Sequence, residues 1–344
     1  MRSLEDDANE RAGAAPGPGD DAERAEQAER RTGLLFGLGA YSYWAFVFPL
    51  HLHLLNTVAP ASLVQAKTAW SLEILGQRVA WSLIVCLGLL TWLRRWGRLR
   101  ATLGRPRSLA TLAATASLVS VNWGVFIYAV STEQLYRGSI GYFITPLVSA
   151  LLGVIFLGER PRPWQWGAFG VAACGIAWLV LDAGHLPWIE LTLACSFGLY
   201  GLLRKRVDAG PIVGLSIETA ALTPAALGYL AWAALAGEQA TGFARAGLGT
   251  SLLLAATGLS TALPLLWFAS AARRLPLVTI GFLQFLAPTG QFVLSLILGN
   301  EPPDGAWPGY VLIWAGVVVF ATESYAAARR RRRAKSVELG LERA

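Results

Sequence analysis

The hydrophobic and polar positions of this chain are segregated into long blocks rather than alternating within each helical turn. The apolar blocks are about 17 to 25 residues long, the length at which a helix crosses roughly 30 Å of hydrocarbon. Ten such blocks occur, at about residues 33–55, 71–93, 109–130, 138–157, 164–181, 187–203, 212–236, 248–271, 276–299 and 307–323. The pattern predicts an all-α integral membrane protein with ten transmembrane helices.

Composition agrees with a membrane protein. The 344 residues are 54% hydrophobic and only 15% charged, whereas a soluble domain needs a larger polar surface. The 36 glycines suit close contact between helices in lipid, where small residues let the backbones approach.

Basic residues in the connections predict the orientation, because the connections that stay in the cytoplasm are rich in lysine and arginine. Three basic residues lie in one alternate set of connections, at Lys67, Arg137 and Arg245. The other set contains thirteen, namely Arg94, Arg95, Arg98, Arg100, Arg105, Arg107, Arg160, Arg162, Arg204, Lys205, Arg206, Arg273 and Arg274. With ten spans, this asymmetry predicts that both termini are cytoplasmic.

The two tails differ from the spans in composition. Residues 1–32 contain nine acidic and five basic side chains among alanine, glycine and proline. No apolar run precedes residue 33, so we expect a disordered cytosolic tail rather than a signal peptide. Residues 327–344 form a basic tail, which we interpret as a topology determinant near anionic headgroups and not as a nucleic-acid site.

One motif occurs twice. Pro146 precedes Glu159 by thirteen residues, and Pro288 precedes Glu301 by the same distance. The motifs lie in the fourth and ninth spans, so they predict two five-helix repeats, at 33–182 and 187–326. An odd number of spans per repeat inverts the second copy in the membrane, as in many carriers. The alternative to duplication is that the two motifs match by coincidence.

Motifs for catalysis and metal binding are missing from the sequence. Three cysteines show no CxxC spacing, and His51 and His53 point to different sides of a helix. The sequence lacks HExxH, a glycine-rich phosphate loop and GxSxG. We therefore expect no metal, no cofactor and no enzymatic activity.

Charged side chains within the spans are candidates for function, because each costs roughly 2.5–3.5 kcal/mol at the centre of a bilayer. Arg78 is a candidate anchor for an anionic substrate group or a structural counter-ion. Glu218 is a candidate proton or cation site or a structural carboxylate. Glu73 and Glu190 lie near outer helix ends, where we expect them to reach water.

Uncharged polar residues and aromatic residues extend the set of candidates. Asn122, Gln284 and Gln291 are amides within spans and should point into the bundle, toward substrate or a neighbouring helix. Tyr142 is a further candidate, which could line a substrate path through the bundle. Aromatic residues that could line the path or instead form an interfacial belt are Trp44, Trp123, Tyr142 and Phe143.

Proline occurs inside two of the predicted spans. Pro146 and Pro288 each free a backbone carbonyl one turn earlier and predict helix bends. Such bends could act as hinges in a carrier. The alternative is that proline is merely tolerated there, because neighbouring groups satisfy the freed carbonyl.

Six segments carry a resemblance to a known family. They are LEILGQRVAWSL (72–83), NWGVFIYAV (122–130), GSIGYFITPLVSALLGVIFLGERPRP (138–163), SFGLYGLLRK (196–205), LSIETAALTP (215–224) and FLQFLAPTGQF (282–292). Over residues 32–325 the chain resembles the RarD family of EamA-type transporters, in the drug/metabolite transporter superfamily. The resemblance implies a ten-helix inner-membrane carrier with two inverted halves, whose family name comes from chloramphenicol sensitivity.

The chain departs from the family pattern at three places. The connection at about 55–71 is longer, Gly76-Gln77 replaces the usual Ala-His, and Gly299-Asn300-Glu301 replaces Tyr-Gly-Glu. If the histidine protonates in relatives, this chain must use another group or none.

These observations favour a secondary active transporter, an exporter or permease, for a small organic metabolite or drug-like solute. We expect it in the cytoplasmic (inner) membrane, with the lipid bilayer and a small-molecule substrate as partners. The sequence is compatible with a homodimer, and no nucleic-acid partner is expected. The alternative function is a non-transporting membrane sensor or assembly factor.

Overall fold

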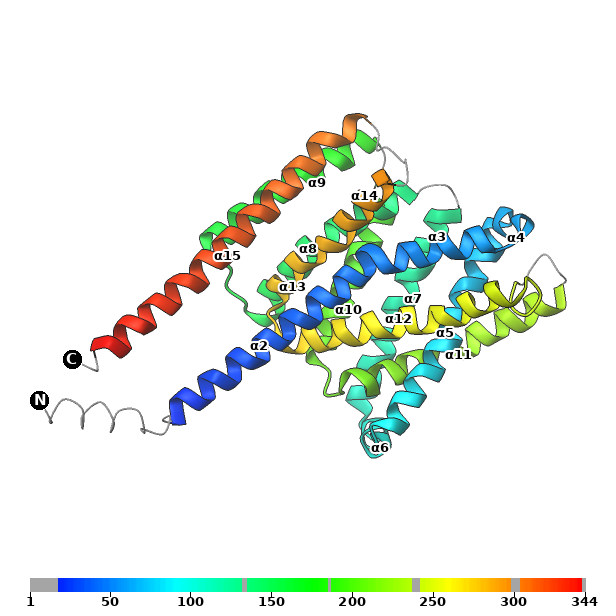
Figure 1. Ribbon diagram of the computed structural model, residues 1–344, viewed down its shortest axis with the longest axis horizontal. Helices are drawn as coiled ribbons and strands as arrows, with labels where there is room; N and C mark the ends of the chain where they lie inside the picture. The colour runs from blue at the N-terminus through cyan, green and yellow to red at the C-terminus, as the bar shows by residue number, and fades with distance from the viewer. Residues whose placement is uncertain (1–17, 132–134, 185–186, 237–241, 298–303, 342–344) are drawn as a thin grey trace, which may run out of the picture.

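The computed structural model describes residues 18–131, 135–184, 187–236, 242–297 and 304–341, and in these ranges the regular structure is entirely helical (Figure 1). The first half contains α2 (Pro18–Ser42), the π-helix η1 (Tyr43–Val47), α3 (Phe48–Val58), α4 (Ala61–Gln65), α5 (Lys67–Trp92), α6 (Trp96–Leu103), α7 (Pro106–Ser131), α8 (Leu135–Leu157) and α9 (Pro163–Ala183). The second half contains α10 (Trp188–Arg206), α11 (Pro211–Ala236), α12 (Leu248–Arg274), α13 (Leu277–Gln284), α14 (Leu286–Ile297), the 3-10 helix η3 (Asp304–Ala306) and α15 (Trp307–Leu341). The all-α prediction is confirmed.

Nine helical segments within the described ranges are long and apolar enough to cross a membrane. They correspond to nine of the ten predicted spans. The remaining span is α10, a helix of 19 residues with Glu190 in its first turn and Arg204, Lys205 and Arg206 in its last turn. α10 packs against α7 and α8 inside the bundle, so protein surrounds much of this less apolar helix.

Both ends of the membrane bundle continue as helix beyond the predicted boundaries. α2 begins at Pro18, so residues 18–32 are helical where we expected disorder. The helix of the first span simply extends into the acidic segment, which is rich in alanine and glutamate, both strong helix formers. Residues 1–17 lie outside the described ranges. α15 likewise runs through the basic segment to Leu341, and the start of α2 and the end of α15 lie toward the same end of the molecule (Figure 1).

Close approach of small residues joins α9 to α15, which run side by side along one edge of the molecule (Figure 1). A Cβ added at Gly175 would lie 2.5 Å from the Gly309 carbonyl oxygen, and one added at Gly316 would lie 2.7 Å from the Ala168 carbonyl oxygen. Both distances are too short for any side chain. Glycine therefore sets the distance between these two helices, as expected for helix packing in lipid.

The helix pairs follow the pattern expected of a duplicated unit. α5 packs on α11, α8 on α13 and α9 on α15, which are the second, fourth and fifth helices of each half packed on their counterparts. α2 packs on α12, and the counterpart contact between α10 and α7 is also present. Exchanging the halves reproduces these contacts, which supports two repeats. Their exact boundaries, 33–182 and 187–326, stay a prediction.

The two proline-bearing helices differ. The ninth span is divided into α13 and α14 at Phe285, immediately after Gln284, whose carbonyl Pro288 cannot engage by the usual i−4 bond. α8 continues past Pro146 without interruption. The helices touch at Gly281, where a Cβ would lie 2.7 Å from the Pro146 carbonyl oxygen. Glu301, the second glutamate of the repeated motif, lies outside the described residues.

Candidate functional site

A cavity of about 120 Å³ lies between helices of both halves, at the level of the proline residues. Seven aromatic side chains form much of its wall, and six side chains bring polar groups. The aromatic residues are Tyr41, Trp44, Phe48, Trp123, Phe126, Tyr142 and Phe197. The polar residues are Arg78, Asn122, Thr145, Thr261, Gln284 and Gln291. Leu265, Ala287 and Pro288 complete the wall, and we call this space the central cavity.

Five of the six predicted substrate contacts line this one cavity. They are Arg78, Asn122, Tyr142, Gln284 and Gln291, which come from four different spans. Tyr142 and Gln284 lie at the same position of the fourth and ninth spans, four residues before Pro146 and Pro288. Both halves therefore contribute equivalent positions to the wall. Whether these side chains bind substrate stays a prediction.

Among the described residues, Arg78 is the one charged side chain in the cavity wall. Its Nε donates a hydrogen bond of 2.8 Å to Thr261 Oγ1 on α12. The guanidinium carbon lies 4.7 Å from the centre of the Phe48 ring and 5.1 Å from that of the Trp123 ring. Two aromatic faces therefore hold the cation by cation–π attraction, which is stronger where water is excluded.

The three amides hold neighbouring helices together at the edge of the cavity. Asn122 Nδ2 donates to the Leu193 carbonyl and to Ser196 Oγ of α10, each at 3.0 Å. Gln284 Oε1 accepts from Ser149 Oγ at 2.9 Å, which links α13 to α8. Such bonds between membrane helices are worth only about 0.6 kcal/mol on average, so orientation of the amides is their main effect.

The π-helix η1 brings the first span against the interrupted ninth span. Gln291 Nε2 donates to the Trp44 carbonyl in η1 at 3.0 Å, and a Cβ at Gly290 would lie 2.5 Å from that of Ala45. A π-helical turn changes the phase of the helix and often occurs at functional sites. Here it lies where Trp44 enters the cavity wall.

Of the four ambiguous aromatic residues, Trp44, Trp123 and Tyr142 line the cavity. Phe143 does not. It is buried and packs against Tyr310 of α15, with ring centres 5.5 Å apart. Successive residues of a helix point about 100° apart, which separates Phe143 from its neighbour Tyr142.

An aromatic cluster closes one end of the cavity. Phe268 packs against Tyr41, Phe197 and Tyr200, with ring centres 5.3 to 6.3 Å apart. Phe268 and Tyr200 are buried and lie one turn beyond the cavity-lining residues of α12 and α10, toward the basic ends of those helices. We call these four residues the aromatic floor.

Glu218 lies outside the cavity wall, in a buried cluster of its own. Its Oε1 accepts from Thr115 Oγ1 at 2.6 Å and lies 3.7 Å from Arg204 Nη1, and Tyr200 Oη donates to Oε2 at 3.4 Å. The Glu218 and Arg204 side chains are 2% and 1% exposed. This arrangement favours the structural carboxylate over a substrate contact.

Our expectation that Glu73 and Glu190 reach water is wrong, because both are buried. Glu73 accepts hydrogen bonds from the backbone N–H groups of Gly242 at 2.6 Å and Phe243 at 2.9 Å. Two donors replace the water that the carboxylate would otherwise need. Glu190 lies at the start of α10 against Gly141 of α8.

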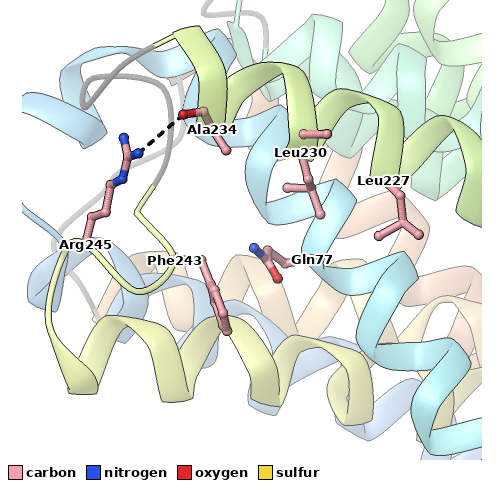
Figure 2. Close-up of a pocket in the computed structure, with 7 residues that line it drawn as sticks. Gln77, Leu227, Leu230, Ala234, Phe243 and Arg245 are labelled. Atoms are coloured by element: carbon pink, nitrogen blue, oxygen red, sulfur yellow. Dashed lines mark hydrogen bonds between the residues drawn. The ribbon is translucent and has the colours of Figure 1, made fainter.

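A second cavity, of about 410 Å³, opens between α5, α11 and the segment that leads into α12 (Figure 2). Leu227, Leu230 and Phe243 make its lining mostly apolar. Arg245 donates to the Ala234 carbonyl at 3.3 Å, and Gln77 accepts from Trp81 Nε1 at 3.0 Å. Gln77, one of the departures from the family pattern expected from the sequence, thus lines this second cavity, which we call the side cleft. Its lining is mostly apolar and Arg245 is exposed, so fewer buried polar groups face the side cleft than face the central cavity.

Residues of the described ranges include no group of three histidine, cysteine or acidic side chains that could hold a metal. His51 instead faces α12, where Nδ1 lies 2.7 Å from Ser260 Oγ and Nε2 lies 3.0 Å from the Leu253 carbonyl oxygen. His53 is exposed. The two rings therefore point apart, in agreement with their two-residue spacing on a helix.

Several residues of the wall escaped prediction from the sequence. Tyr41 and Phe48 lie one turn on either side of Trp44, so that spacing could have indicated them. Phe197 and Thr261 are ordinary residues of apolar helices, and no spacing marks them. These two enter the cavity because α10 and α12 pack against the first half.

The fold and the central cavity define a multi-pass α-helical membrane protein with a polar, aromatic cavity between its two halves. The EamA-like transporter family matches residues 31–181. Protein RarD of Streptomyces exfoliatus is 45% identical over 306 residues, covering 88% of this chain and 92% of the relative. An uncharacterized transporter of Vibrio cholerae is 36% identical over 311 residues, covering 90% of this chain and 98% of the relative.

A solved crystal structure of another protein shares the fold, with a TM-score of 0.57 and 19% identity over 87% of this chain and 98% of that chain. The chain belongs to the RarD family of EamA-like transporters.

Proposed function

We propose that this protein is a secondary active transporter that moves a small organic solute across the cytoplasmic membrane through the central cavity. The observation that carries the proposal is the position of that cavity. Equivalent positions of the fourth and ninth spans face it, and the charged side chain Arg78 lies in its wall. Relatives named as transporters support the same class of function.

We infer that transport occurs by alternating access between the two halves. In carriers with inverted repeats, the halves adopt slightly different conformations and exchange them, which opens a central site first to one side and then to the other. The uninterrupted α8 and the divided α13 and α14 are such a difference between counterparts. The orientation predicted from basic residues puts the aromatic floor on the cytoplasmic side.

The test has two stages. Metabolites inside and outside cells are first compared between deletion and overexpression strains, with chloramphenicol tolerance included. The purified full chain is then reconstituted in liposomes with an imposed proton or sodium gradient. We expect the solute that changed in cells to accumulate against its own gradient.

The second candidate is a membrane sensor or assembly factor that moves no solute. Liposomes in which every tested solute only equilibrates at the rate of protein-free controls would favour that function over transport.

A further inference from the structure

Among the described residues, no acidic side chain pairs with the charge on Arg78. Ion pairs between described residues involve Arg105, Arg162, Arg204, Lys205 and Arg274, and none involves Arg78. Its hydrogen bond goes to a neutral hydroxyl, and within the described residues Nη1 and Nη2 have no acceptor. An unpaired cation in a low-dielectric site is costly, so the cavity favours an anion.

The Nη1 and Nη2 groups of Arg78, which have no acceptor among the described residues, are suited to bind an oxyanion. Guanidinium presents its N–H groups in a planar fork that binds a carboxylate through two parallel bonds. Since Thr261 and the two rings fix the Arg78 head, its orientation is set before a ligand arrives. Preorganisation of this kind lowers the entropy lost on binding.

A second polar group lies in the wall. Tyr41 is 2% exposed and its hydroxyl lies near the Gln284 amide, but within the described part of the chain it makes no hydrogen bond of regular geometry. A buried hydroxyl without a regular hydrogen bond costs free energy, which a ligand that supplies an acceptor or donor would recover. Tyr41 belongs to the aromatic floor, whereas Arg78 lies against Phe48, two helical turns further along the first span.

Size and shape limit the rest of the ligand. The cavity of about 120 Å³ is comparable with the engineered apolar cavity of about 150 Å³ that binds benzene. Its walls are mainly aromatic faces, which favour a flat apolar body through stacking and edge contacts. A ligand much larger than one ring does not fit this conformation.

We propose that the central cavity binds a small monoanion in which one carboxylate, held by Arg78, is attached to a flat apolar body of about one ring. A second polar atom on the far side of that ring would reach Tyr41. This inference rests on the proposed function for its biological meaning, but it concerns binding and is tested separately.

Binding of benzoate, benzamide, acetate and chloramphenicol to the purified full chain tests the proposal. Tryptophan fluorescence reports the titration, since Trp44 and Trp123 lie in the wall. Benzoate and benzamide have nearly the same shape and differ in charge. We expect benzoate to bind about tenfold or more tightly than benzamide, from the strength of hydrogen bonds to charged groups. We also expect benzoate to bind more tightly than acetate.

Variants assign the effect to the cavity. Arg78→Gln should weaken benzoate about tenfold or more and leave benzamide unchanged, with Arg78→Lys intermediate. Arg245→Gln, in the side cleft, is the matched control and should change neither. If Arg78→Gln does not insert correctly, the ratio of benzoate to benzamide in the unaltered chain decides.

Equal affinity for benzoate and benzamide, benzoate binding that survives Arg78→Gln, or chloramphenicol bound more tightly than benzoate would overturn the proposal. Liposome flux separates the two hypotheses. Benzoate binding without any flux would refute transport alone, whereas flux of another solute without benzoate binding would refute only the anion site.

Discussion

At the scale of single residues, burial separates two roles that look alike in the sequence. Arg78 and Glu218 are both charged residues deep in apolar segments. The structure gives Glu218 a complete set of partners, Thr115, Tyr200 and Arg204, and leaves the Arg78 head facing a cavity. A charge whose partners are all protein groups serves stability, and a charge that faces a cavity is available to a ligand.

Removal of one member of the buried Glu218 and Arg204 pair should destabilise the protein strongly. Glu218→Gln leaves a guanidinium that is 1% exposed without its counter-charge, which costs about 3–5 kcal/mol in comparable pairs. We expect a clear fall in the thermal unfolding temperature in detergent.

The pair Arg105 and Asp208 provides the control. Its side chains are 57% and 79% exposed, so Arg105→Gln should cost no more than about 1 kcal/mol. A fall after Glu218→Gln no larger than that after Arg105→Gln would contradict the structural role.

At the scale of elements, the contact between α9 and α15 depends on the absence of side chains. Gly175 meets backbone of α15, so the two helices cannot approach in this way if a Cβ is added.

Gly175→Ala should therefore destabilise the protein by about 1–3 kcal/mol, the usual cost of overpacking. Gly167 lies on the same helix with nothing within 4 Å of an added Cβ, so Gly167→Ala should be neutral or slightly stabilising. Thermal unfolding of both variants checks the prediction, and equal behaviour would show that the helices can separate without cost.

At the scale of the whole molecule, one carboxylate joins the two halves at the end of the bundle near the aromatic floor. Glu159, just after α8, accepts hydrogen bonds from the first N–H groups of α13, Leu277 at 2.6 Å and Val278 at 2.8 Å. It also lies 3.6 Å from Lys205 Nζ of α10. A negative charge at a helix N-terminus is favourable, so Glu159 stabilises this closed end. Glu159 therefore acts at a helix end and does not line the central cavity.

With the proposed orientation and alternating access, Glu159→Gln should loosen that end and favour a conformation that is open to the cytoplasm. A glutamine side chain still offers one acceptor but no charge to α13 or Lys205. We expect faster modification of a cysteine placed at Phe268 by a polar maleimide added from the cytoplasmic side. The same cysteine with Glu159 intact is the control, and unchanged reactivity would refute the closing role.

The sequence by itself determined what depends on local composition. Apolar length gave the spans, basic residues gave the expected orientation, and the cost of polar groups in lipid picked out Arg78, Asn122, Gln284 and Gln291. Even α10, which is not apolar enough to be recognised as a span by composition, begins and ends within a few residues of its predicted span.

Tertiary structure alone decided which of these groups meet. Glu218 and Arg78 are both charged residues deep in apolar segments. Only the packing of α10 against α11 shows that Glu218 is paired with Arg204. Thr261 and Phe197 enter the cavity because helices far apart in sequence cross there, and the π-helical turn η1 changes the phase that a regular helix would have. A periodicity along one helix contains no information about its neighbours, so the ligand-facing surface appears only when both halves are assembled.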